Sequence, residues 1–394
     1  MVPGIRRTGD TLYKKSYSRE ERSMKKKLLS ALLCTAMVAT LAVGCGGGNN
    51  DSGNADSGSS SEATNDAGDD AEEVGDDGGE SGSGTYAIVT KSAGNPFNEK
   101  TADGFQEVIE AAGGTAIVKH PEAPTADAQV SVIQSLISQG VDSICIAAND
   151  ENALQAALEE AMDAGIKVCC EDSKTNPDSR QVFVNQAGVQ EIGQALMDAV
   201  LDISGGEGQW AVLSATSQAA NQNAWIDAMK EVMESDDKYS GLELVEVAYG
   251  DDEPQKSTDQ TQALLAKYPD LKVICAPTTV GINAAAKVLQ DEKSSVKLTG
   301  LGLPSEMAEY IGDDDDHSCP YMYLWNPIDL GRLGAYTSMA LVDGTITGAE
   351  GDKFTAGDMG DYEIVAADDG GTEMILGAPF KFDADNIDEW KDVY

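Results

Sequence analysis

Histidine is almost missing from this chain of 394 residues, which contains only His120 and His317. Neither histidine stands in a Cys/His spacing that is typical of a zinc site. Neither lies in a loop that carries a candidate binding residue, so the commonest general base of enzymes is absent from those loops. The sequence also lacks the Gly-x-Ser-x-Gly elbow and the Gly-x-x-x-x-Gly-Lys-Ser/Thr loop. We therefore expect no catalysis, no metal and no cofactor.

Basic residues are scarce as well, with 27 Lys and Arg against 68 Asp and Glu and a formal net charge of −41. Residues 1–44 carry a net charge of +6, and residues 46–84 carry eleven acids and no base, which leaves −36 on residues 85–394. A folded region with such a large negative charge repels nucleic acid and anionic lipid. We expect no nucleic-acid partner and a ligand that is neutral or cationic.

Cysteines that suit a disulfide framework are also few. Cys145, Cys169, Cys170 and Cys275 lie in apolar, strand-like runs, which favours buried free thiols. A disulfide from Cys145 to Cys169 or Cys170, between neighbouring strands, is the open alternative. The acidic run at 313–316 lacks the alternating ligands and the turn glycine of a calcium loop, so a solvated turn is favoured there over calcium binding.

The segment from Met24 to Cys45 has the features of an export signal. Three lysines at 25–27 precede an apolar stretch at 28–43 that is too short for a comfortable membrane span. A basic start, a short apolar region and small residues before the cut describe a secretory signal peptide. Because Cys45 follows those small residues directly, the segment resembles the lipobox of bacterial lipoproteins. The weaker alternative is an ordinary signal peptide with an incidental cysteine.

Residues 46–84 consist mainly of Gly, Ser, Asn, Ala, Asp and Glu. Such a segment cannot bury enough apolar surface to offset the entropy lost on ordering. We expect an acidic, self-repelling linker, with an acidic docking tail as the weaker alternative. Residues 1–44 would then be upstream residues and signal peptide, and a lipidated Cys45 would hold the protein at the extracytoplasmic face of the cell membrane.

From Thr85 onward, short apolar strands alternate with amphipathic helices. About 310 residues exceed one typical core, so two domains are expected. Strands of this kind between helices indicate parallel sheets covered on both faces, and the count gives two such sheets in succession. The predicted strands are 86–90, 115–118, 143–147, 167–170, 181–184, 209–214, 242–248, 273–276 and 296–301. The predicted fold class is therefore α/β with two doubly wound parallel sheets.

The loops that follow these strands carry the candidate binding residues. Ligands in such folds bind beyond the carboxyl ends of the strands. Carboxylate, amides, hydroxyls and an ammonium group meet there, and this set suits a neutral ligand with many hydroxyl groups. The residues are Lys91, Phe97, Asp172, Asn221, Gln222, Pro277 and Thr279. Helix capping or core packing stays an alternative for Phe97, Asp172 and the 221–222 pair, and Trp225 is favoured as a core residue.

The ordered string of these motifs resembles the type I periplasmic sugar-binding proteins, in the branch with the rhamnose-binding and autoinducer-2-binding proteins of ABC importers. The resemblance covers nearly all of residues 85–394. The motifs that carry it are Lys91 with Gly94-Asn95-Pro96-Phe97, Asp172-Ser173, Asn221-Gln222-Asn223-Ala224-Trp225, Tyr249-Gly250-Asp251-Asp252, Ala276-Pro277-Thr278-Thr279 and Leu324-Trp325-Asn326-Pro327.

The resemblance implies two lobes joined by a three-segment hinge, with the crossovers near Gln186–Gly188, Leu301–Leu303 and Trp325–Asn326. The N-terminal lobe would be residues 85–187 plus 303–325. The C-terminal lobe and tail would be residues 188–302 plus 326–394. A membrane permease and its ATPase are the implied partners of a monomeric binding protein.

The ligand is also an implication of the resemblance. Autoinducer-2 binders hold their ligand through positions that match Lys91, Asp172, Asn221, Gln222, Pro277 and Thr279, and Asn326 is placed at the cleft or hinge. In well-known members the position of Asn221 is Asp and that of Thr279 is Ala. We therefore expect a rhamnose-like sugar, or a related deoxysugar or pentose. Autoinducer-2 uptake, or sugar sensing for a membrane receptor, are the alternatives.

Overall fold

The computed structural model describes residues 84–394. The predicted signal peptide, Cys45 and all but the last residue of the predicted linker lie outside the described residues. Within the described part, no helix combines the length and apolar character needed to cross a membrane.

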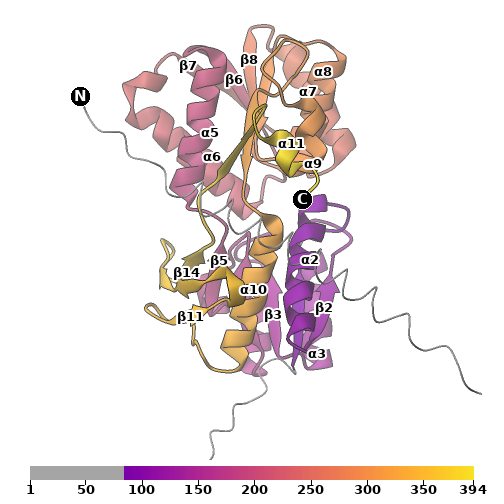
Figure 1. The fold of residues 1–394 in the computed structure, drawn as a ribbon, viewed down its shortest axis with the longest axis vertical. Coiled ribbons are helices and arrows are strands. Elements are labelled where there is room, and N and C mark those ends of the chain that lie inside the picture. Colours follow the sequence, from indigo (N-terminus) through magenta and orange to yellow (C-terminus); the bar gives the residue numbers. More distant parts are fainter. Residues whose placement is uncertain (1–83) are drawn as a thin grey trace, which may run out of the picture. The chain divides into compact units, whose positions relative to one another are not determined.

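The N-terminal lobe is built on a seven-stranded sheet of order β13-β14-β5-β4-β3-β1-β2. All neighbouring pairs are parallel except β13 with β14. Helices α2 and α10 pack side by side on this lobe (Figure 1). Its elements are β1 (Thr85–Val89), α2 (Pro96–Ala111), β2 (Thr115–Lys119), α3 (Ala126–Gln139), β3 (Ser143–Ile146), α4 (Gln155–Asp163), β4 (Lys167–Glu171), β5 (Val182–Asn185), α10 (Pro327–Val342), β11 (Lys353–Thr355), β12 (Asp361–Glu363), β13 (Val365–Ala366) and β14 (Thr372–Ile375).

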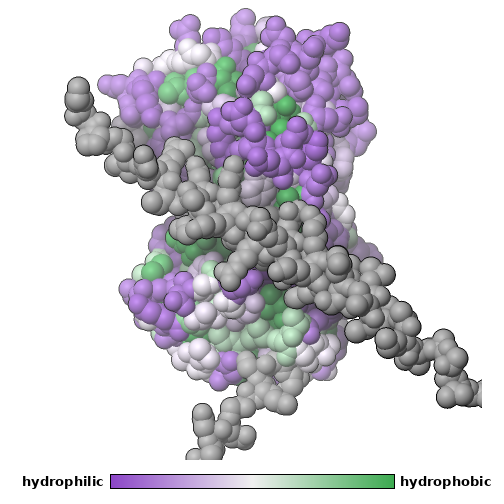
Figure 2. All heavy atoms as spheres, in the orientation of Figure 1, coloured by the Kyte–Doolittle hydropathy of each residue, from purple (hydrophilic) through white to green (hydrophobic). Residues whose placement is uncertain are grey.

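The C-terminal lobe has a parallel sheet of order β7-β6-β8-β9, and β10 pairs with β15 in an antiparallel ribbon beside it. The face of this lobe seen in Figure 2 is mostly hydrophilic. Its elements are α5 (Val189–Ser204), β6 (Gly208–Ser214), α6 (Ala220–Ser235), β7 (Leu242–Tyr249), α7 (Pro254–Lys267), β8 (Leu271–Ala276), α8 (Thr279–Asp291), β9 (Lys297–Gly300), α9 (Pro304–Met307), β10 (Tyr321–Leu324), β15 (Phe380–Asp383) and α11 (Ile387–Trp390). The two sheets confirm the predicted α/β fold class.

Local sequence explains where the helices begin and end. Asn95 caps α2 by accepting a hydrogen bond from the Phe97 N–H, and Pro96 occupies the first helical position. Thr125 caps α3, which ends at Gly140 in the left-handed conformation that glycine adopts readily. These signals lie in the sequence itself, so local residues account for where α2 begins and where α3 begins and ends.

The chain crosses between the lobes at residues 186–188, 325–326 and 376–379, as the assignment of the flanking elements shows. The chain crosses at the first and third predicted positions, although at 325–326 it passes from the C-terminal to the N-terminal lobe, the reverse of the predicted direction. The crossover predicted at Leu301–Leu303 is wrong. After β9 the chain stays in the C-terminal lobe, where Leu301 forms a β-bridge with Tyr323 and α9 contacts α8.

The predicted lobe boundaries need the matching correction. Residues 303–325 belong to the C-terminal lobe, and residues 326–375 belong to the N-terminal lobe. Helix α10 packs on α2 and against β3 and β4, and β14 extends the sheet beside β5 (Figure 1). The close packing of α10 on α2 depends on Gly104 and Gly331, since a Cβ at either would overlap a backbone carbonyl of the other helix.

The cysteines of the described residues are buried and free, as the sequence predicts. They are Cys145, Cys169, Cys170, Cys275 and Cys319. Cys145 and Cys169 are register partners on β3 and β4, and both face the core.

Candidate functional site

Strand β1 and the start of α2 bring three polar side chains to the cleft between the lobes. Lys91 follows β1 and is buried, and its backbone carbonyl accepts a hydrogen bond of 2.8 Å from Asn149 Nδ2. Asn95 is the cap of α2, and Asn98 Nδ2 donates to the Ser92 carbonyl at 2.8 Å. Because these backbone contacts fix the loop, Lys91 Nζ is directed across the cleft rather than into solvent.

Asp172 reaches the same cleft from a tight turn after β4. Its φ is +56°, a region that non-glycine residues seldom adopt, and the Ser173 N–H donates to the Glu171 carbonyl at 2.5 Å. A three-residue turn of this hand is strained and persists only where the surroundings hold it. Through this turn, the Asp172 carboxylate reaches the cavity directly from the end of the buried strand β4.

The C-terminal lobe supplies the opposite wall from three strand ends. Asn221 and Gln222 lie in the first turn of α6, which follows β6. Asp252 follows β7 with a φ of +53°, and its Oδ1 accepts a hydrogen bond of 2.5 Å from the Thr278 hydroxyl. Thr279 begins α8. All of these residues lie at the carboxyl ends of parallel strands, where the α/β topology predicts a site.

Hydrogen bonds join the two walls. Lys91 Nζ donates to Asn221 Oδ1 at 2.6 Å and to Gln222 Oε1 at 3.4 Å, and it lies 3.4 Å from Asp172 Oδ2. Asn221 Nδ2 donates to Asp172 Oδ2 at 3.0 Å. The Thr279 hydroxyl donates to Asn95 Oδ1 at 3.3 Å. The Lys91–Asp172 ion pair lies within the N-terminal lobe, whereas the four hydrogen bonds each link one lobe to the other, so the described conformation is closed over the site.

The walls border a cavity with about 370 Å³ of space between the lining atoms, part of which is open to solvent. Phe97, Trp225 and Trp325 form its aromatic side. The Trp325 ring centroid lies 6.2 Å from that of Phe97 and 5.6 Å from that of Trp225, in edge-to-face arrangements. A ligand with both hydroxyl groups and an apolar edge matches this combination of walls.

Two buried carboxyl groups, Glu171 and Asp172, and the half-buried Asp252 lie near the buried ammonium group of Lys91. Burial raises the pKa of Asp172, and the positive charge of Lys91 opposes that rise. Burial also raises the pKa of Asp252. Glu171 is 1% exposed, and burial followed by the charge of Asp172 raises its pKa well above the usual range. The excess of acid over base makes the site unsuited to an anionic ligand.

The structure brings together most of the residues predicted from the sequence. Lys91, Phe97, Asp172, Gln222, Pro277 and Thr279 line the cavity. Asn221 is hydrogen-bonded to three of them, Lys91, Asp172 and Gln222, and lines a neighbouring, smaller cavity. Asn326 does not line the cavity: it caps α10, accepting from the backbone N–H groups of Ile328 and Asp329.

Sequence reasoning missed several lining residues. These are Asn95, Asn98, Trp225, Asp252, Thr278, Leu301, Leu324 and Trp325. Asp252 stands directly after a predicted strand, so the same strand-end argument that identified Asp172 applies to it. The aromatic residues carry no such signal, because a buried tryptophan is as typical of a core as of a cavity wall.

No group of three or more His, Cys, Asp or Glu side chains in residues 84–394 is arranged to hold a metal ion. The cavity groups are instead hydrogen-bond donors and acceptors of mixed kinds. The arrangement can therefore bind and orient a small polar molecule.

Comparison with known proteins relates this geometry to a family. The profile of the family described as "Periplasmic binding protein domain" matches residues 86–346. An ABC transporter solute binding protein from Clostridium phytofermentas, solved with bound L-rhamnose, is 63% identical with a TM-score of 0.78; the match covers 79% of this chain and 99% of that one. A sugar ABC transporter structure from Actinomyces odontolyticus is 40% identical with a TM-score of 0.63, over 79% of this chain and 98% of that one.

More distant relatives share the architecture. LsrB from Clostridium saccharobutylicum, in complex with AI-2, is 23% identical with a TM-score of 0.72, over 78% of this chain and 99% of that one, and shows the fold alone. The D-ribose/D-allose-binding protein of Pseudomonas aeruginosa is 28% identical over 202 residues, which are 48% of this chain and 61% of that relative. The chain thus matches less than two thirds of the length of this curated relative. By its profile match and its 63% identity to a solved member, the chain belongs to the periplasmic binding protein family, among the ABC transporter solute-binding proteins with the type I fold.

Proposed function

We propose that this protein captures L-rhamnose, or a closely related deoxysugar or pentose, in the cavity between its lobes and delivers it to an ABC importer. The observation that carries the proposal is the cavity itself, where Lys91, Asp172 and Gln222 face an aromatic wall. The relative solved with L-rhamnose, at 63% identity, supports the choice of sugar.

The chemistry of the walls matches a 6-deoxy sugar. A sugar hydroxyl both donates and accepts, so a carboxylate such as Asp172 takes its proton and an ammonium such as Lys91 donates to its oxygen. Rhamnose also has a methyl group, which is apolar and suits contact with Trp325 and Leu324. Since the cavity region holds more acid than base, a neutral ligand is favoured over an anionic one.

The mechanism is closure around the ligand. In the open state the lobes exchange sugar with solvent, and a sugar that hydrogen-bonds both lobes favours the closed state by the difference in its affinity for the two states. The crossover segments at 186–188, 325–326 and 376–379 absorb the rotation. The closed form then docks on a permease with its ATPase.

Isothermal titration calorimetry with L-rhamnose, autoinducer-2, D-ribose, D-xylose and D-galactose tests the proposal. We expect L-rhamnose to bind far more tightly than the other four. Binding of autoinducer-2 in its place would make signal uptake the function, and heat from none of the five would reject a rhamnose-like ligand.

The place of action is a second part of the proposal. The run from Met24 to Cys45 supports export and lipidation of Cys45, and the acidic residues after it support a tether to the extracytoplasmic face of the membrane. In a bacterial host, the protein is expected to partition into the detergent phase of Triton X-114, and the Cys45→Ser variant into the aqueous phase. Equal partitioning of both would reject the anchor.

A further inference from the structure

A second cavity adjoins the first on the side of the crossover at residues 186–188, with about 280 Å³ of space between its lining atoms, part of it open to solvent. Asp172 and Trp225 line both cavities, so these two side chains form the partition between them. The walls of the second cavity come from both lobes, with Asn185 on β5 facing Ala224 on α6. A ligand group placed there would contact both lobes in the closed state.

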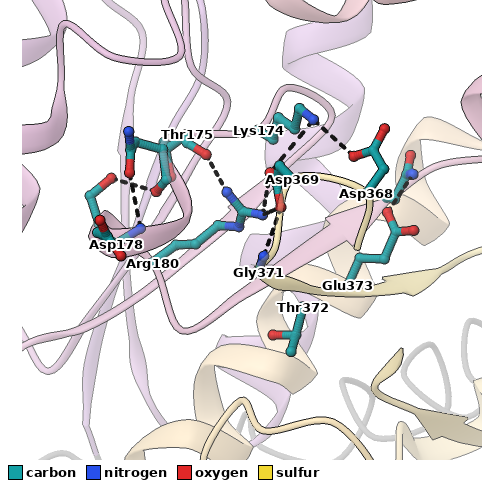
Figure 3. Close-up of polar contacts among 12 residues, drawn as sticks. Lys174, Thr175, Asp178, Arg180, Asp368, Asp369, Gly371, Thr372 and Glu373 are labelled. Carbon is teal, nitrogen blue, oxygen red and sulfur yellow. Dashed lines mark hydrogen bonds and ion pairs between the residues drawn. The ribbon is translucent and has the colours of Figure 1, made fainter. Parts of the chain in front are cut away.

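The polar wall of this second cavity is held in place by a network of ion pairs (Figure 3). Lys174 Nζ lies 3.1 Å from Asp368 Oδ1 and 3.5 Å from Asp369 Oδ2. Arg180, whose side chain is 1% exposed, donates to both oxygens of Asp369 at 3.0 and 2.7 Å. Bidentate pairs of this kind fix geometry as well as charge. The turn between β13 and β14 therefore fixes the position of Lys174.

Asn185 is fixed in the same way, because its Nδ2 donates to Glu373 Oε2 at 2.9 Å. Gln186 differs from these neighbours. It is 1% exposed and lines the second cavity, yet its Oε1 has no hydrogen-bond partner among the described residues. A buried amide oxygen left unpaired costs free energy, so its presence at a cavity wall indicates a donor that arrives with a ligand.

The remaining lining is aromatic or small. Phe183 and Trp225 supply ring surface, and Ala220 and Ala224 leave room between them. Amides, an ammonium group and aromatic rings are the same classes of group that line the first cavity. The second cavity thus has the chemistry of a carbohydrate subsite.

We propose that the second cavity is a subsite for a hydroxylated unit joined glycosidically to the sugar in the first cavity, so that short rhamnosides are ligands of this protein. The inference rests on the proposed function, because the first cavity must hold the terminal sugar. Asp172, at the partition, would bind hydroxyls beside the glycosidic oxygen, and Gln186 would accept a hydrogen bond from the second unit.

Calorimetry on the full chain tests the proposed subsite with three kinds of probe. They are L-rhamnose, methyl α-L-rhamnoside, and rhamnosyl-rhamnose disaccharides with α-1,2, α-1,3 and α-1,4 linkages. We expect at least one disaccharide to bind roughly tenfold more tightly than the methyl glycoside, the gain of about one well-made hydrogen bond. If L-rhamnose binds and no disaccharide exceeds the methyl glycoside, the subsite is rejected while the proposed function stands. If L-rhamnose itself fails to bind, both are rejected.

Two variants locate the effect. Ala224→Phe fills the second cavity without touching the lining of the first, so it should abolish the disaccharide gain and leave L-rhamnose affinity within about threefold. Gln186→Met keeps the size of the side chain and removes the amide, so it should lower the ratio of disaccharide to L-rhamnose affinity by roughly tenfold. An effect on the hinge would change both affinities alike and leave that ratio unchanged. An unchanged ratio in both folded variants would overturn the assignment.

Discussion

Asp172 is the residue on which the two cavities and the cross-lobe network meet. Its carboxylate contacts Lys91 and Asn221, and its backbone adopts a conformation that a non-glycine residue seldom takes. The strand-end argument located it from sequence, because the position after a parallel strand is set by topology. The strained turn had no signal in the sequence, since only the observed φ reveals it.

Replacing Asp172 tests its role in binding. Asp172→Asn keeps the side-chain shape and a residue type that tolerates positive φ. We expect L-rhamnose affinity to fall by roughly 30- to 150-fold, because a hydrogen bond to a charged group contributes about 2–3 kcal/mol. Asp251→Asn is the matched control, since Asp251 also has positive φ but pairs with Lys256 outside the cavity. Wild-type affinity in folded Asp172→Asn would mean that the site is misplaced.

Glu171 gives a prediction about pH. Burial raises its pKa well above that of the unfolded chain, and its Oε2 has no partner among the described residues. The folded state therefore binds a proton more tightly than the unfolded state, and stability falls as pH rises from the unfolded pKa, near 4.5, through the folded pKa. Glu171→Gln is expected to melt at a higher temperature than wild type at pH 8, with the difference shrinking toward pH 5.

Thermal melts of both proteins in matched buffers from pH 5 to pH 8 measure this difference. The pKa values of Asp172 and Asp252 are raised as well, so part of the pH dependence of stability should remain in Glu171→Gln. A wild type more stable than Glu171→Gln at pH 8 would show that the carboxylate is paired and that its pKa is not raised.

At the scale of elements, the nine strands predicted up to residue 301 match β1 to β9 closely, whereas the elements after residue 301 and the tertiary partners were not predicted. Capping residues and glycines mark helix ends locally, as Thr125 and Gly140 do for α3. Which sheet α10 covers depends instead on packing against α2, and no local pattern encodes that choice. Asn326, predicted at the cleft or hinge, lies in the crossover at 325–326, where it caps α10 and does not line the cavity.

The α2–α10 contact gives an element-level prediction. Gly331→Ala places a Cβ against the Thr101 carbonyl, so the helices must separate. We expect the free energy of unfolding to fall by about 2–3 kcal/mol or more. Gly334→Ala on the same helix is the control: its Cβ would lie 3.1 Å from Cys145 Sγ, with no backbone in the way. Urea unfolding compares the two variants. Equal midpoints for them would contradict the close approach of the helices.

At the scale of the whole described molecule, three crossovers allow the lobes to move and a few polar contacts hold them closed. Lys91 makes two of these contacts, to Asn221 and Gln222. The crossover at residues 376–379 was not predicted from the sequence. The chain returns to the C-terminal lobe there only after short strands that resemble an irregular tail. The family resemblance predicted the number of crossovers, whereas their positions depend on tertiary packing.

Removing the ammonium of Lys91 should favour the open state. In solution X-ray scattering, wild type is expected to contract on addition of L-rhamnose, whereas Lys91→Met should stay expanded at the same sugar concentration, because it loses both contacts across the cleft. Lys238→Met, at an exposed ion pair with Asp198, is the control. Identical radii of gyration for Lys91→Met and wild type with sugar would contradict a role of Lys91 in closure.

The central claim is that a rhamnose-like sugar lies between the lobes, against Lys91, Asp172 and the aromatic wall. A crystal structure of the protein grown with L-rhamnose tests it most directly. We expect density for the sugar in the cavity, with hydroxyl oxygens within about 2.7–3.2 Å of Lys91 Nζ and of an Asp172 carboxylate oxygen. Closed lobes with no sugar at these residues, or sugar bound elsewhere on the molecule, would contradict it.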